Sequence, residues 1–284
     1  MNHRSRSVAP GCRGLLKLTL TVLAASYGGS AVGDELPLWE VGIGALPSTF
    51  PAYRGSQDQK YYLLPFPYVA YRGDILQIDR DGIRASLFRS DRVQLNLSLG
   101  GAIPAESDGG GAREGMPDLD GALEIGPALE ILVATPSPRQ KVEIRLPVRA
   151  VLVTNFRRVD PEGWVFNPQV AWDYEGEGSG WNAGLSLGPL FADRKYHAYY
   201  YDVESQYATP ERPAFRATGG YSGAVVVGTV SRRVGHIWIG GFLRYDNLAG
   251  AAFVDSPLVE TRHAATGGVA VAWIFAASTK MVAN

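Results

Sequence analysis

Hydrophobic and polar residues alternate one by one along much of this chain. Residues 141–154 show it most clearly: the apolar set is Val142, Ile144, Leu146, Val148, Ala150 and Leu152, and the set between them includes Glu143, Arg145, Pro147 and Arg149. Consecutive side chains of an extended strand point to opposite faces, whereas a helix repeats every 3.6 residues. The segment therefore predicts a strand with one apolar face and one charged face.

The two preceding segments repeat this alternation. In residues 93–99 Val and Leu alternate with Gln, Asn and Ser, and in residues 123–133 Leu, Ile and Val oppose Glu124, Gly126, Ala128 and Glu130. In a soluble sandwich the charged face meets water, whereas in a membrane barrel it lines the lumen and the apolar face meets lipid. The alternation alone fits both architectures.

Further strand-like runs follow one another with turn residues between them. They cover residues 38–46, 61–71, 75–88 with a break at 81–82, 163–174, 180–190, 218–231, 235–245 and 266–275. Residues 103–118 and 202–213 are too polar and too rich in turn residues to be strands, so we expect loops there. The chain is predicted to be all-β with roughly 10–12 strands, and a single antiparallel transmembrane β-barrel is favoured over a soluble sandwich, an even number of strands being typical of bacterial barrels.

The N-terminus has the order of a secretory signal peptide. Arg4, Arg6, Arg13 and Lys17 precede an uncharged stretch over residues 18–33, which ends in small residues before Asp34. We therefore expect residues 1–33 to be removed and residues 34–284 to form one barrel domain in the bacterial outer membrane. The single cysteine, Cys12, would leave with the signal peptide, and its place before the apolar stretch argues against a lipoprotein signal.

Composition narrows the partners. Lys and Arg total 27 against 28 Asp and Glu, so no general positive field exists to hold nucleic acid. Aromatic residues lie mostly near the ends of the strand-like runs, where interfacial girdles facing outer-membrane lipid would place them; ordinary core packing is the alternative. These aromatics are Tyr61, Tyr62, Phe66, Tyr68, Tyr71, Trp164, Phe166, Trp172, Tyr174, Trp181, Tyr196, Tyr199, Tyr200, Tyr201, Trp238, Tyr245 and Trp273.

Catalytic chemistry finds little support in the sequence. His197 lies near two aspartates, His263 lies near Glu260, and His236 stands apart, but a chain of this length offers such pairs by chance. Residues 219–223 read Gly-Gly-Tyr-Ser-Gly, which lacks the Gly-x-Ser-x-Gly spacing and the following helix of a nucleophile elbow. No histidine spacing fits a metal site. We predict a protein that is not an enzyme and that has no cofactor or metal.

The charges of the polar strand faces form the candidate site. It consists of Glu124, Glu130, Glu143, Arg145 and Arg149, which fall on the less apolar faces of successive strands. Antiparallel pairing would bring carboxylates opposite guanidinium groups, and this pairing would offset the cost of enclosing them. Such a cluster either stiffens and plugs a narrow lumen or lines a selective channel, and the first is favoured for a barrel of this size.

Several short motifs, in order, resemble the MipA/OmpV family of outer-membrane proteins. They are YRGS at 53–56, LPFPYVAYRGD at 64–74, GMPDL at 115–119, EIGP at 124–127, GGYSG at 219–223, RYDNLAGA at 244–251 and DSPL at 255–258. The resemblance spans nearly the whole mature chain. One departure is that Trp273 and Phe275 are followed by further residues to Asn284, where many barrels end in an aromatic residue.

The resemblance implies an outer-membrane barrel that acts as a scaffold. The family's named member interacts with a murein lytic transglycosylase and links it to a peptidoglycan synthase, and other members are connected with adhesion, permeability and antibiotic response. We therefore expect a docking platform for periplasmic enzymes that remodel peptidoglycan. The alternative is a narrow diffusion channel for small polar or cationic solutes, and a barrel hydrolase using His197 or His236 is a more distant one.

Overall fold

The computed structural model describes residues 35–73, 76–79, 82–85, 88–107, 111–155, 157–178 and 180–283. These residues belong to a compact unit that spans Asp34–Asn284. The signal peptide expected over residues 1–33 lies outside the described residues, and its removal stays a prediction. No helix among the described residues is long and apolar enough to cross a membrane.

The unit is built almost wholly from antiparallel strands. They are β1 (Glu35–Pro37), β2 (Trp39–Pro51), β3 (Gln59–Arg72), β4 (Leu76–Asp79), β5 (Gly82–Ala85), β6 (Phe88–Arg89), β7 (Val93–Ala102), β8 (Gly121–Ser137), β9 (Gln140–Thr154), β10 (Val159–Phe166), β11 (Gln169–Tyr174), β12 (Trp181–Ala192), β13 (Gly220–Val234), β14 (Ile237–Asn247), β15 (His263–Ala277) and β16 (Met281–Ala283). Each segment predicted from alternation contains, among its described residues, one long strand or two to three shorter ones.

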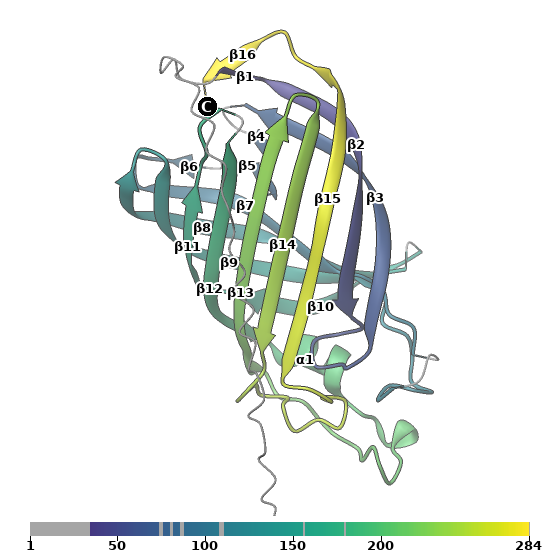
Figure 1. The fold of residues 1–284 in the computed structure, drawn as a ribbon. Helices are drawn as coiled ribbons and strands as arrows, with labels where there is room; N and C mark the ends of the chain where they lie inside the picture. The colour runs from purple at the N-terminus through teal and green to yellow at the C-terminus, as the bar shows by residue number, and fades with distance from the viewer. Residues whose placement is uncertain are drawn as a thin grey trace, which may run out of the picture. The chain divides into compact units, whose positions relative to one another are not determined.

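Among the described residues, the strands form one 14-stranded sheet and a separate pair of β1 with β16. Within the large sheet, strands that follow one another in sequence are hydrogen-bonded to each other, except β5 with β6 and β10 with β11. In addition β2 pairs with β15, so the first and last long strands lie side by side (Figure 1). β5, at one end of the hydrogen-bonded path, also contacts β7, next to the other end. The sheet therefore curls back on itself, and the predicted all-β barrel is confirmed.

The strand number agrees with the prediction once two interruptions are recognised. β10 and β11 pair with the same two neighbours, β9 and β12, and are therefore two parts of one interrupted strand. β5 and β6 are short consecutive pieces at the two ends of the path. If β10 with β11 and β5 with β6 are each counted as one interrupted strand, the fourteen strands of the sheet become twelve.

The two ends of the barrel differ. At one end, here called the turn end, strands are joined by short connections at 90–92, 138–139, 175–180 and 235–236, and β1 pairs with β16. At the other, the loop end, the connections are 52–58, 103–120, 155–158, 193–219 and 248–262, and all except 155–158 are longer than any of those four turns. The residues after Phe275 finish β15 and then form β16, which accounts for the tail that departs from the usual aromatic ending.

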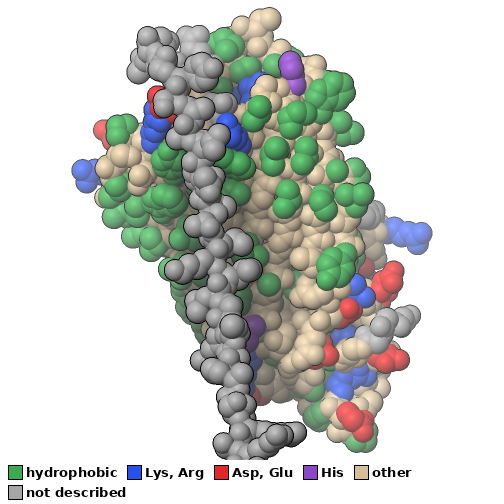
Figure 2. All heavy atoms as spheres, viewed as in Figure 1, with side chains coloured by type: hydrophobic (Ala, Val, Ile, Leu, Met, Phe, Trp, Pro, Cys, Tyr) green, Lys and Arg blue, Asp and Glu red, His purple; other side chains and the backbone are tan. Residues whose placement is uncertain are grey.

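Outward-facing side chains of the strands are apolar and exposed. Ile43, Leu63, Leu243 and Val269 are each more than half exposed. Figure 2 shows hydrophobic side chains spread over the strands of the visible face, with acidic and basic side chains gathered toward the two ends of the barrel, most of them at the loop end. An outer belt of this kind is what hydrocarbon would cover.

The prediction that the aromatic residues form an outward-facing girdle is correct for only some of them. Trp164, Trp181 and Trp273 are about half exposed on the outer face. Tyr196, Tyr199, Tyr200 and Tyr201 were expected there but lie in a helix, α1 (Arg194–Tyr201), and three of the four are buried. Phe66 and Trp238 lie on the inner face, because they share the parity of inward neighbours. An aromatic near a strand end does not reveal its face unless the register is known.

The helix α1 belongs to a core that fills the loop end. Asp193 caps it by accepting a hydrogen bond from the Tyr196 backbone N–H at 3.0 Å. A short 3-10 helix, η1 (Ser205–Tyr207), follows. The core combines loop residues with inward residues of the strands: Tyr53, Ala105, Met116, Leu119, Val151, Val153, Val165, Leu190, Ala192, Tyr196, Tyr200, Tyr201, Val203, Ala217, Val225, Leu248, Ala251, Phe253 and Leu258. The loops are thus packed elements, although the polar composition of residues 103–118 and 202–213 predicted surface loops.

Candidate functional site

The five residues predicted to line the lumen all lie on the face opposite the exposed apolar belt. Glu124 and Arg149 form one pair, with Oε2 and Nε 3.1 Å apart, and an Arg149 N–H also donates to Ser98 Oγ at 3.3 Å. Alternation on β8 and β9 points both side chains inward, and the register places them diagonally across the ladder.

A second group centres on Arg145. Its guanidinium donates to Glu143 Oε2 at 2.9 Å and to Asp173 on β11. Lys141 Nζ lies 3.6 Å from the other Glu143 oxygen. Glu143 and Asp173 are only 7% and 3% exposed, so these carboxylates are largely dehydrated and the neighbouring cations offset the loss of hydration.

Glu130 links β8 to the neighbouring strand on its other side. Its Oε2 accepts a hydrogen bond from Asn96 Nδ2 at 2.7 Å, and its register partner on β9 is Arg145. The five predicted residues therefore form two adjoining groups along β8 and β9. Asn96 and Asp173 were missing from the prediction; the alternation of β7 signalled Asn96, whereas Asp173 is hidden between the aromatic residues Trp172 and Tyr174.

A polar pocket of about 270 Å³ opens beside these groups at the turn end. Its lining residues come from the turns and from β7, β8, β9 and β11: Asp91, Arg92, Gln94, Glu130, Leu132, Thr135, Pro138, Arg139, Gln140, Lys141, Glu143, Asp173 and Glu175. Acidic and basic side chains are mixed along its wall. The arrangement suits a polar guest or a polar protein surface.

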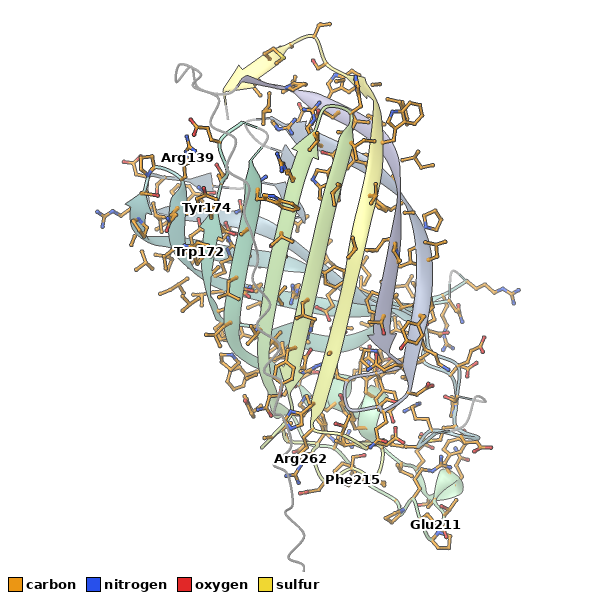
Figure 3. The ribbon with its side chains drawn as sticks, viewed as in Figure 1. Arg139, Trp172, Tyr174, Glu211, Phe215 and Arg262 are labelled. Atoms are coloured by element: carbon orange, nitrogen blue, oxygen red, sulfur yellow. The ribbon has the colours of Figure 1, made fainter. Side chains whose placement is uncertain are left out.

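The rim of this pocket carries an exposed ion pair. Arg139 Nη1 donates to Glu177 Oε2 at 2.9 Å, and this hydrogen bond holds the pKa of the Glu177 carboxyl below its usual value. Trp172 and Tyr174 stand nearby with their rings stacked at 6.4 Å, and Trp172 donates to Gln140 at 3.3 Å. Figure 3 shows Arg139, Trp172 and Tyr174 together at the turn end, and Glu211, Phe215 and Arg262 at the loop end.

Two more ion-paired groups lie inside the barrel on the side of β2, β3, β13 and β14. Glu40, which is fully buried, meets Arg72 at 2.9 Å and Arg233 at 2.5 Å near the turn end. Near the loop end Asp246 accepts from Arg54 at 2.7 Å and from Arg244 at 2.7 Å. The sequence analysis did not single out either group, because their members are far apart along the chain.

Among the described residues that the sequence offered as catalytic candidates, His197 and Ser222 form a buried histidine–serine pair. His197 Nδ1 lies 2.6 Å from the Thr218 carbonyl oxygen, and its Nε2 contacts Ser222 Oγ. Both side chains are fully buried, and burial lowers the pKa of His197. A carbonyl takes the place where a triad needs a carboxylate, and a substrate has no route to the serine. This pair ties α1 to β13.

The other histidine schemes are not formed. Asp193 caps α1, and Asp202 accepts from the Ala217 backbone N–H at 2.6 Å instead of meeting His197. His263 Nδ1 lies 2.6 Å from the Tyr245 hydroxyl, while Glu260 accepts from the Gln57 backbone N–H at 3.1 Å. Within the described part of the chain, no group of three or more His, Cys, Asp or Glu side chains is placed to hold a metal.

Comparison with known proteins gives one family. The chain matches the family of MltA-interacting protein MipA over residues 43–275, from early in β2 to near the end of β15. No curated protein sequence matches the chain. The match takes in all the long strands and the loop-end core, in keeping with the ordered motifs from residue 53 to residue 258. The chain therefore belongs to the MipA family.

Proposed function

We propose that this protein is a non-enzymatic outer-membrane barrel that docks a murein lytic transglycosylase of the MltA kind. The observation that carries the proposal is the family match, because the family is described by its interaction with MltA. The all-β architecture and the exposed apolar belt support a place in the outer membrane. Export by a signal peptide over residues 1–33 is part of the same proposal.

The docking surface we propose is the turn end. Short turns of outer-membrane barrels face the periplasm, and longer loops face outward. The turn end also holds the polar pocket and the exposed pair of Arg139 with Glu177. A periplasmic enzyme would meet this end first, and a peptidoglycan synthase recruited by the same enzyme would be held at the same place.

The interior supports a scaffold better than a channel. Leu248, Phe253 and Leu258 are fully buried in the loop-end core, and the inward charges of Glu143 with Arg145 and of Glu124 with Arg149 form ion pairs. A selective pore needs a hydrated route past its charged ring. The cluster of Glu124, Glu130, Glu143, Arg145 and Arg149 is thus proposed to stiffen the barrel.

Charge reversal at the turn end tests the docking surface. Arg139→Glu places a second acid beside Glu177 and is expected to weaken capture of a purified MltA-type transglycosylase at least tenfold. Arg262→Glu makes the same change on an exposed residue at the loop end and should leave capture unchanged (Figure 3). Binding is measured with barrels in lipid nanodiscs, and equal capture by both variants would reject the turn end as the docking surface.

Planar-bilayer recordings on the same preparation separate scaffold from channel. A docking barrel with a filled interior is expected to give a silent bilayer together with transglycosylase capture. Unitary conductance steps that change in Arg145→Met, together with no capture of the transglycosylase, would refute the scaffold hypothesis in favour of the channel.

A further inference from the structure

A second pocket, inside the barrel, is apolar. It has a volume of about 250 Å³ and is lined by Leu46, Phe66, Asn182, Thr229, Val230, Ser231, Trp238, Gly240, Gly241, Phe242, Gly268 and Ala270. Most of these residues have inward parity on β2, β3, β13, β14 and β15. The charged groups of β8, β9 and β11 are absent from this lining. The interior therefore has a polar side and an apolar side.

Glycines on the inner wall make room for large rings. A Cβ on Gly44 would meet the Phe66 ring at 2.5 Å, and a Cβ on Gly240 would meet the Trp238 ring at 2.2 Å. At Gly268 it would approach Leu46 and Phe242 at 2.8 and 3.0 Å. The rings therefore occupy the space that a side chain at these glycines would fill, and all three rings line the pocket.

Ion pairs bound this apolar layer at both ends. Along β13, Thr229 and Ser231 are followed on the same face by Arg233, which pairs with Glu40; along β14, Phe242 is followed by Arg244, which pairs with Asp246. Because these charges already have partners, a charged guest would gain little from them and would lose its hydration. The pocket favours a neutral guest.

One polar group in the wall lacks a partner. The Ser231 side chain is 3% exposed, and its Oγ makes no hydrogen bond with any described residue. An unsatisfied buried hydroxyl costs about 1–3 kcal/mol, so a group that accepts or donates a hydrogen bond there would be favoured. Asn182 and Thr229 also line the pocket, but of these three polar side chains Ser231 is the one with a buried oxygen that has no partner among the described residues, so it offers a fixed point for a polar atom.

We propose that the apolar pocket binds a neutral single-chain amphiphile, with its hydrocarbon chain between Phe66, Trp238 and Phe242 and its hydroxyl bonded to Ser231. Drug-sized ligands occupy about 300–1,000 Å³, so a pocket slightly below that range accepts one short chain and not a two-chain phospholipid. This binding is independent of the docking proposed for the turn end.

A photoreactive decanol carrying a diazirine tests the proposal on the full barrel in phosphatidylcholine vesicles. After irradiation, peptide mapping should find label that saturates and is displaced by decanol at inward positions such as Leu46 and Phe242. Outward positions such as Ile43 and Val271 face lipid and should show only label that does not saturate. Saturable label confined to outward positions would overturn the proposal.

Two pairs of variants sharpen the result. Ala270→Leu fills the pocket and should reduce inward labelling at least tenfold, whereas Val271→Leu, on the outer face, should not change it. Ser231→Ala should weaken competition by decanol about fivefold and leave competition by decane unchanged. Ser48→Ala removes another buried hydroxyl that has no partner among the described residues but lies outside the pocket lining, and should have no effect. Stronger competition by decanoate than by decanol would reject a neutral ligand.

Discussion

Removal of Arg145 tests whether the inner charges stabilise the barrel. In Arg145→Met the carboxylates of Glu143 and Asp173 keep their burial, at 7% and 3% exposure, but lose the guanidinium that both contact. Lys141, whose Nζ lies 3.6 Å from Glu143, would remain beside that carboxylate. Breaking a buried ion pair from one side costs about 3–5 kcal/mol, so the free energy of unfolding should fall by that amount.

The assay is equilibrium unfolding by urea of the barrel in phosphatidylcholine vesicles, followed by tryptophan fluorescence. Arg139→Met is the matched control, because it breaks the exposed pair with Glu177 and should cost no more than about 1 kcal/mol. Adding Glu143→Gln and Asp173→Asn to Arg145→Met should recover most of the loss, since it removes the uncompensated charge. Equal losses for Arg145→Met and Arg139→Met would refute the reasoning.

Two further predictions concern the helix at the loop end. Burial lowers the pKa of His197 below its usual value of 6.5. At a pH between 6.5 and the pKa of the folded state, the unfolded chain binds a proton that the folded chain does not. The free energy of unfolding therefore falls as the pH falls through this range. The drop in unfolding free energy from pH 7.5 to pH 5 should therefore be smaller in His197→Gln, and an unchanged drop would contradict this. Asp193→Ala removes the cap of α1 and should cost about 1 kcal/mol in the same urea assay, whereas Asp193→Asn should keep most of it; equal losses would argue against the cap.

The strands were predictable because a period of two needs no knowledge of tertiary structure. Where one face is apolar and the other polar, as in residues 141–154, alternation alone fixes the strand and its two faces. Inward charges such as Glu124 and Arg149 followed from the same rule. Asp173 did not, because its partner depends on the register of β11 against β9, which only the folded sheet reveals.

The loop end was not predictable in the same way. Residues 194–201 include four tyrosines, which have only modest helix propensity, and the cap at Asp193 is a weak signal by itself. Tyr201 and Phe253 are in contact although they lie far apart in the chain, so no local pattern of hydrophobic residues predicts their burial. For the same reason the serine–histidine pair, with residues from α1 and β13, emerged only from the fold.

Closure of the lumen at the loop end can be tested by removing the rings that fill it. Tyr201 and Phe253 stack at a centroid distance of 3.6 Å, and both are buried, so changing both to alanine removes two rings from this core. Each change alone should cost about 3–5 kcal/mol, with the pair less than additive because the rings share one contact. If the loop-end core seals the barrel, the double variant should also conduct ions in planar bilayers, whereas Phe275→Ala, which removes an exposed ring from the outer face, should stay silent. A folded double variant that remains silent would show that the ion pairs of β8, β9 and β11 seal the barrel without the loops.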